Sequence, residues 1–163
     1  MGQFGLFIQQ SGRNNTTTQN QDGSNNYAGA KQDNTMSGPN IIYQTQSSGS
    51  RNFAIATQND EDNVANQSQS GDANAAMINQ SGKGLNTAYQ NQVGNSNFAS
   101  IDQTNGDGTD QNLANQLQTG NENYMTSKQN GKGNTSNQYQ LGDDNDAAVD
   151  QEGAFNTATQ DQK

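Results

Sequence analysis

The chain has no cysteine, histidine or tryptophan among its 163 residues, and Pro39 is its single proline. The lack of cysteine excludes a disulfide framework, and it leaves the redox compartment open. Because histidine is also missing, a Ser-His or Cys-His nucleophile system and a histidine-ligated metal site are excluded. We therefore expect no enzyme activity, no cofactor and no metal.

Hydrophobic residues are scarce, at 26% of the chain, and aromatic residues supply 6%. A conventional globular core of this length needs far more leucine, isoleucine, valine and phenylalanine. Read without its order, the composition is typical of a disordered, amide-rich segment. Any order must therefore come mainly from backbone and side-chain amide hydrogen bonds.

Positive charge is also scarce, because seven Lys and Arg stand against sixteen Asp and Glu, for a net charge of -9. This balance argues against nucleic acid or an anionic membrane as a partner. No apolar run reaches the length of a membrane helix, and residues 1–10 lack the basic region and cleavage pattern of a signal peptide. We expect either a cytosolic protein or a mature form in which Met1 replaces a removed signal and export segment.

The chain does contain a strict repeat: an Asn is followed six residues later by a Gln, thirteen times. A separation of six places both side chains on one face of a strand, whereas on a helix they would diverge by about 240°. The repeat therefore predicts strands of seven residues. The expected amide ladder, with the Gln residues at strand position 5 included, is Asn15, Gln19, Gln21, Asn26, Gln32, Asn40, Gln44, Gln46, Asn52, Gln58, Asn63, Gln67, Gln69, Asn74, Gln80, Asn86, Gln90, Gln92, Asn97, Gln103, Asn112, Gln116, Gln118, Asn123, Gln129, Asn134, Gln138, Gln140, Asn145, Gln151, Asn156, Gln160 and Gln162.

Positions 1, 3, 5 and 7 of each strand share a face, and position 3 is mostly alanine, which indicates a tightly packed interior. Position 5 alternates between Gln in one strand and mainly Ala, Ile or Val in the next, so the true repeat is two strands. The segment from Phe4 to Gln10 extends the pattern backwards, with Leu6 and Ile8 at positions 3 and 5. We expect a tail at residues 1–3 and then one domain, 4–162, of fourteen strands in seven rungs: 4–21, 26–46, 52–69, 74–92, 97–118, 123–140 and 145–162.

Most connections have four residues with Gly second, which predicts a turn conformation that disfavours other residues. Variation in the repeat is confined to the connections: longer ones at 33–39 and 104–111, and an acidic one at 59–62. Because the strands keep their length, the sequence preserves the register of the strands. Two strands of a rung could form a hairpin or an arch. The arch is favoured because it stacks like positions about 4.8 Å apart, Asn on Asn and Gln on Gln. The expected fold is all-β: a β-solenoid of β-arch rungs forming two parallel sheets, cross-β on assembly.

The in-phase pattern of Gln, Gly, Asn, Ala and Gln, seen from Gln69 to Gln80 and from Gln140 to Gln151, resembles the curlin repeat of curli. The resemblance spans Phe4 to Gln162. It departs in beginning both strand kinds with Asn and in having seven rungs where five are typical. The resemblance implies a secreted, extracellular fibre subunit of the bacterial cell surface, a functional amyloid of the biofilm matrix that supports adhesion.

The same resemblance implies three partners: copies of the chain in a homopolymer, a nucleator subunit and a dedicated export pore. The last rung, 145–162, keeps every ladder residue and is acidic. That favours the major subunit over the alternative, the minor nucleator. Because neither terminal rung is followed by a capping segment, we expect open backbone edges and end-to-end growth.

Acidic pairs, lysine-flanking glycines and outward threonines are the other candidate binding features of the chain. Asp60 with Asp62, and Asp143 with Asp144, could be calcium-binding or catalytic pairs, but solvated turn charges are the simpler interpretation. The glycines around Lys83 and Lys132 lack Walker spacing and indicate tight turns. A soluble ice-binding or ligand-binding solenoid needs a flat array of outward Thr, which here is interrupted, for example by Tyr89 and Leu113.

The outward face of the strands without Gln at position 5 carries four aromatic residues at one strand position: Tyr27, Phe53, Phe98 and Tyr124. They are interpreted either as β-formers that stack on rung neighbours or as a lateral-contact stripe that bundles fibrils. Charged residues interrupt this face and are expected to restrain premature pairing: Lys31, Asp102, Lys128, Asp146 and Asp150.

Overall fold

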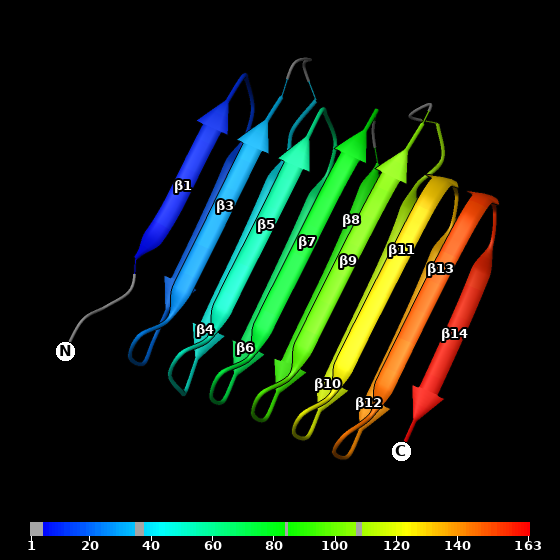
Figure 1. Ribbon diagram of the computed structural model, residues 1–163. Coiled ribbons are helices and arrows are strands. Elements are labelled where there is room, and N and C mark those ends of the chain that lie inside the picture. Colours follow the sequence, from blue (N-terminus) through cyan, green and yellow to red (C-terminus); the bar gives the residue numbers. More distant parts are fainter. Residues whose placement is uncertain (1–4, 35–37, 84, 107–108) are drawn as a thin grey trace.

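The computed structural model describes residues 5–34, 38–83, 85–106 and 109–163. These residues form fourteen β-strands and no helix, arranged as two seven-stranded parallel sheets in a β-solenoid (Figure 1). No helix able to span a membrane is found in the described part of the chain. The all-β, two-sheet solenoid predicted from the repeat is confirmed. The expected tail at residues 1–3 and the expected first strand residue, Phe4, lie outside the described residues.

Odd-numbered strands build one sheet and even-numbered strands build the other. The odd sheet contains β1 (Leu6–Ser11), β3 (Tyr27–Asp33), β5 (Phe53–Asn59), β7 (Ala75–Gly82), β9 (Phe98–Asn105), β11 (Tyr124–Lys132) and β13 (Asp146–Ala154). The even sheet contains β2 (Thr16–Gln21), β4 (Ile41–Ser47), β6 (Val64–Ser70), β8 (Asn86–Val93), β10 (Asn112–Thr119), β12 (Thr135–Leu141) and β14 (Thr157–Gln162). The chain therefore crosses from one sheet to the other at every turn between consecutive strands.

The pairing register follows the repeat without a slip. Ala28 of β3 pairs with Ala54 of β5, and Gln32 pairs with Gln58. In the even sheet, Gln44 of β4 pairs with Gln67 of β6. Each named strand pairs in parallel with its counterpart in the neighbouring rungs, so the arch is confirmed over the hairpin.

Most strands begin one residue later than the repeat predicts. In β3 the strand starts at Tyr27, and Asn26 lies in the corner before it. The Asn side chain is drawn to the turn, as when the Asn26 amide donates to the backbone oxygen of Asp22 at 2.9 Å. The backbone ladder still includes the Asn residues, because the Tyr27 N–H donates to the Asn52 carbonyl at 2.8 Å. The corner is thus held by both backbone and side chain.

The interior between the sheets is narrow and mixed. Small and aliphatic side chains form its apolar core: Ala30, Ile42, Ala56, Ala65, Ile78, Ala88, Ile101 and Ala114. In most strands position 3 is alanine, and this small side chain leaves room for the inward amides. Gln58, Gln69 and Gln80 are fully buried. Burial of so many amides is tolerated only where they are hydrogen-bonded.

The glycine at the second turn position has a steric reason. Gly94 has a φ of 116°, which other residues rarely adopt, and a Cβ there would lie 1.9 Å from the carbonyl oxygen of Gly120 in the next rung. Gly23 has the same relation to Gly49. Successive turns therefore stack as closely as the strands do.

The two ends of the stack are β1 with β2 and β13 with β14, at opposite ends of the molecule (Figure 1). Leu6 and Ile8 point inward by register, yet they are 55% and 49% exposed, because no described strand packs on the outer edge of β1. Among the described residues no strand pairs with the outer edge of either terminal rung. Within the part of the chain that the structure describes, both ends of the stack are therefore open.

Candidate functional site: amide ladders and open ends

Three columns of glutamine run the length of the solenoid. In each column the side-chain amide donates to the side-chain oxygen of the following rung, for example from Gln46 to Gln69 at 2.9 Å. The columns are Gln10, Gln32, Gln58, Gln80, Gln103, Gln129 and Gln151; Gln19, Gln44, Gln67, Gln90, Gln116, Gln138 and Gln160; and Gln21, Gln46, Gln69, Gln92, Gln118, Gln140 and Gln162. Every rung is bonded to the next in all three columns.

The second amide proton of most of these glutamines reaches the opposite sheet. Gln67 in β6 donates to the backbone oxygen of Ile55 in β5 at 2.9 Å. Gln80 in β7 donates to the backbone oxygen of Val64 in β6, also at 2.9 Å. The glutamines thus tie the two sheets together as well as the rungs. These cross-sheet bonds could not be predicted from the repeat, because they depend on the distance between the sheets.

Asparagine columns run along both sheets, and their hydrogen bonds point the other way. The Asn74 amide donates back to the Asn52 side-chain oxygen at 3.2 Å, and the Asn74 backbone N–H donates to the same oxygen at 3.0 Å. Asn74 also donates forward to the Gly94 carbonyl at 2.8 Å. The bonded columns are Asn26, Asn52, Asn74, Asn97, Asn123 and Asn145; and Asn40, Asn63, Asn86, Asn112, Asn134 and Asn156.

Asn15 is the exception within the predicted ladder. Its amide donates to the backbone oxygen of Ser11 at 2.7 Å, but its side-chain oxygen is buried without a partner. The side-chain oxygen of Gln19 is in the same situation. Both residues belong to the first rung, so these two unpaired amide oxygens lie at one end of the solenoid, whereas the unpaired buried hydroxyls of Ser127 and Ser136 lie in later rungs.

This direction of bonding makes the two ends chemically different. At the first rung, the oxygens of Gln10, Gln19 and Gln21 have no preceding rung to donate to them. At the last rung, Gln151 and Gln162 donate one amide proton to the carbonyls of Thr135 and Asp146. Among the described residues no following rung accepts the column-directed amide protons of Gln151, Gln160 and Gln162. A buried acceptor without a partner costs about 1–3 kcal/mol. One end offers acceptors and the other offers donors in the same three columns.

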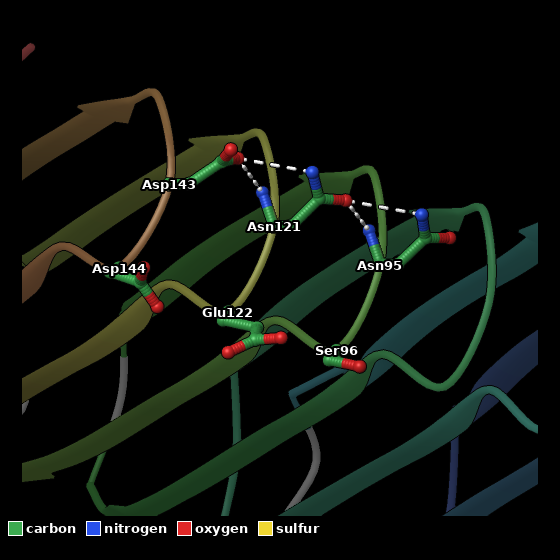
Figure 2. Close-up of a pocket in the computed structure, with 6 residues that line it drawn as sticks. All are labelled: Asn95, Ser96, Asn121, Glu122, Asp143 and Asp144. Atoms are coloured by element: carbon green, nitrogen blue, oxygen red, sulfur yellow. Dashed lines mark hydrogen bonds between the residues drawn. The ribbon is translucent and has the colours of Figure 1, made fainter.

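The turns between even and odd strands contain a further ladder that sequence reasoning missed. At the third turn position, the Asp143 carboxylate accepts the Asn121 backbone N–H at 2.7 Å and the Asn121 amide at 3.0 Å (Figure 2). Asn121 accepts from Asn95 in the same way, at 3.0 and 3.1 Å. The available signal was the residue type, because Ser24, Ser50, Asp72, Asn95, Asn121 and Asp143 all carry a side-chain oxygen.

Asp72 belongs to this turn ladder and shows its electrostatic effect. Its carboxylate accepts the Ser50 backbone N–H at 2.7 Å and the Ser50 hydroxyl at 3.0 Å. These two bonds, with a smaller contribution from the Arg51 charge, lower the pKa of Asp72. The turn therefore favours the ionised carboxylate.

The acidic pairs lie in turns. Asp60 and Asp62 both have left-handed backbone conformations, with φ of 68° and 60°. Within the described residues, no group of three or more Asp, Glu, His or Cys side chains is placed to hold a metal ion. Gly82 ends β7 and Gly131 lies at the end of β11, Gly133 directly follows β11, and all three have positive φ, whereas Gly84 lies outside the described residues.

The aromatic stripe is two stacked pairs rather than one continuous row. The Tyr27 and Phe53 rings are 5.2 Å apart between centroids, and the Phe98 and Tyr124 rings are 4.8 Å apart. Ala75 separates the pairs, because it pairs with Phe53 on one side and Phe98 on the other. The interpretation as β-formers stacked on rung neighbours is confirmed within each pair.

The Thr array that an ice-binding face needs is interrupted in the structure as well. Tyr43 and Tyr89 stand among the outward side chains of the even sheet, and each is 43% exposed. Thr87 is buried and accepts a hydrogen bond from the Gln111 side chain at 2.6 Å.

Comparison of this chain with protein families, curated proteins and solved structures found no match.

Proposed function

We propose that this chain is a structural protein, the major subunit of a curli-like extracellular amyloid fibre that grows by end-to-end stacking. The observation that carries the proposal is the pair of open, complementary solenoid ends. Their complementarity makes a second copy of the chain the natural partner of each end. Biofilm adhesion, location at the bacterial surface, a nucleator subunit and an export pore follow from the resemblance to curlin repeats and belong to the same proposal.

The joint between two copies continues the existing columns. The last-rung amides of Gln151, Gln160 and Gln162 would donate to Gln10, Gln19 and Gln21 of the next copy. This would satisfy the buried Gln19 oxygen that is unpaired in the single chain. A contact between two different ends does not close on itself, so it generates an open filament.

Apolar contact supports the same joint. Leu6 and Ile8 occupy strand positions 3 and 5 of the first rung and are about half exposed. In a continued stack they would lie against Ala147 and Val149, which occupy those positions in β13. Full burial of an aliphatic side chain contributes about 1.5–3 kcal/mol at most. Burial of Leu6 and Ile8 would therefore contribute substantially to the stability of the joint.

Lateral bundling of such filaments is assigned to the aromatic stripe. Phe53 and Tyr124 are 38% and 46% exposed and come from different stacked pairs. Lys128 and Asp150 border the stripe and lie 3.9 Å apart at a well-exposed position. Charges of this kind disfavour close pairing of bare sheet faces, which fits a role in restraining premature association.

The test is assembly of the purified chain and of one end variant. The wild type is expected to form thioflavin-positive fibres with a cross-β reflection near 4.8 Å. Ile8→Lys places a charge in the joint and is expected to abolish elongation, whereas Ser100→Lys, on the outward face of β9, is the matched control and should still elongate. Wild-type protein that stays monomeric, or Ile8→Lys fibres that grow at the wild-type rate, would refute the proposal.

A further inference from the structure

The outer face of the even sheet has a different character from the rest of the surface. We call it the even face and define it by the outward residues of β2 to β12: Thr16, Thr18, Asn20, Ile41, Tyr43, Thr45, Val64, Asn66, Ser68, Thr87, Tyr89, Asn91, Leu113, Asn115, Leu117, Thr135, Asn137 and Tyr139. None of these residues is charged. The seventh strand of the sheet, β14, carries Asp161 beside Tyr139, so six of the seven strands present a neutral face in a chain with sixteen acids and seven bases.

Apart from Asp161 and Lys163 at the β14 end, the charges lie on other surfaces. Outward positions of the odd sheet carry Lys31, Asp102, Lys128, Asp146 and Asp150, and most remaining acids are in the turns. The even face therefore offers no counter-ion to a charged partner, and the acidic edges repel an anionic one. Its partner is expected to be neutral.

Tyrosines recur on the even face in every second strand of the sheet: Tyr43 in β4, Tyr89 in β8 and Tyr139 in β12. Tyr43 and Tyr89 occupy the same register column with Asn66 between them, so they are two strand spacings apart, roughly 9.5 Å. Tyr139 is 41% exposed and pairs with Leu117 in the neighbouring column. These rings are platforms with an apolar surface and a polar tip.

A shallow hollow of about 360 Å³ lies beside Tyr89. Its lining includes Leu117, with the amides of Asn66, Asn91 and Asn115 around it. The Asn115 amide also donates to the Asn137 oxygen at 2.8 Å, which orients it. An apolar surface rimmed by neutral donors and acceptors suits a ring that has C–H groups on its faces and hydroxyl groups around its edge, which describes a sugar.

The strands beneath this hollow are fixed. Gln90, next to Tyr89, is buried and donates to the Met77 carbonyl at 2.9 Å and to Gln116 at 3.0 Å. A site on such a rigid support loses little entropy when a ligand binds. Because the face runs over six strands of one sheet, an extended chain of sugars can contact several tyrosines at once.

We propose that the even face binds an extended, neutral polysaccharide, with Tyr43 and Tyr89 as stacking platforms and Asn66 and Asn115 as hydrogen-bonding partners. A second copy of the chain is the less favoured occupant, because the stacked aromatic pairs lie on the odd sheet. The proposal concerns the single solenoid and does not depend on fibre growth.

The test is depletion of freshly dissolved, unassembled protein by insoluble neutral glycans: cellulose, chitin and a β-1,3-glucan. A tube without glycan corrects for self-sedimentation. The wild type is expected to bind at least one of the three, and Tyr43→Ala with Tyr89→Ala is expected to weaken that binding by about tenfold or more. The matched control, Phe53→Ala with Tyr124→Ala on the odd sheet, should stay within about twofold of the wild type.

Carboxymethylcellulose, the anionic counterpart of cellulose, should bind more weakly than the neutral polymers. The proposal is overturned if the wild type binds none of the three neutral glycans, if both double variants lose binding equally, or if the anionic polymer binds best. A result in which fibres form without glycan binding removes this inference alone. Glycan binding without fibres removes the assembly proposal alone.

Discussion

Replacement of one central glutamine should cost far more than replacement of a terminal one in the same column. Gln67 is buried and takes part in three side-chain hydrogen bonds. It accepts from Gln44 at 2.8 Å, donates to Gln90 at 3.0 Å and donates to the Ile55 carbonyl at 2.9 Å. Gln67→Leu keeps most of the side-chain volume and leaves three buried polar groups without partners.

Each orphaned group costs about 1–3 kcal/mol, so the free energy of unfolding should fall by about 3–9 kcal/mol. That is comparable with the whole stability of a typical domain, about 5–15 kcal/mol. Gln160 accepts from the Gln138 amide at 2.9 Å, so Gln160→Leu leaves that one amide group without its partner. The terminal variant should therefore lose only about 1–3 kcal/mol.

The assay is urea unfolding of unassembled protein, followed by far-UV circular dichroism, with native-state hydrogen exchange to locate the weakened rungs. Gln67→Leu should lower the urea midpoint and speed exchange in β4, β6 and β8. Outward Ser68→Leu in the same strand is the control and should change stability by no more than about 0.5 kcal/mol. Equal losses for Gln67→Leu and Gln160→Leu would refute the ladder as the source of stability.

Three further predictions concern the turns and the core. Gly94→Ala should lower the melting temperature by several degrees, because its Cβ would meet the Gly120 oxygen at 1.9 Å. Gly106→Ala should leave the melting temperature unchanged, because its Cβ would meet no described atom within 4 Å beyond its chain neighbours, and similar melting temperatures for the two variants would contradict the stacked-turn geometry. Asp72 has a pKa below its usual 3.8, so its stabilising contribution is full above that value and is lost as pH falls through the lowered pKa. Asp72→Asn keeps an acceptor oxygen and should remove this part of the acid sensitivity in unfolding curves between pH 5 and about pH 2; an unchanged pH dependence would count against the turn ladder. Ile78→Ala should cost about 2–5 kcal/mol in urea unfolding, since Ile78 is 1% exposed within the core cluster, and a loss below about 1 kcal/mol would mean that the interior is loosely packed.

The strand repeat could be predicted from the sequence because backbone pairing and side-chain register give the same answer at every rung. An Asn-to-Gln interval of six, such as Asn63 to Gln69, specifies one strand face, and parallel stacking of that face needs no further information. The amide columns follow from it directly. The predicted first residue of each strand was less accurate, since Asn26 and its equivalents turn their side chains into the corner.

The remaining parts depend on distances that a repeat does not encode. The bond from Gln67 to the Ile55 carbonyl requires a particular gap between the sheets. The left-handed residue at the fourth turn position varies in type, as in Asn25, Ala73 and Glu122, so composition does not reveal it. The direction of the Gln columns, and with it the difference between the two ends, emerges only when donors and acceptors are placed.

The lengths of the connections vary mainly on one edge of the solenoid. Those from even to odd strands have four residues between the Gln and the next Asn, with one of five at 47–51, whereas those from odd to even strands include seven residues at 33–39 and eight at 104–111. Lengthening a loop is cheap, about 0.6 kcal/mol for each doubling, and the register on either side of both insertions is intact. The odd-to-even edge can therefore carry added peptide, such as an epitope or an enzyme tag, at a fixed spacing along the stack without disturbing the rungs that hold it.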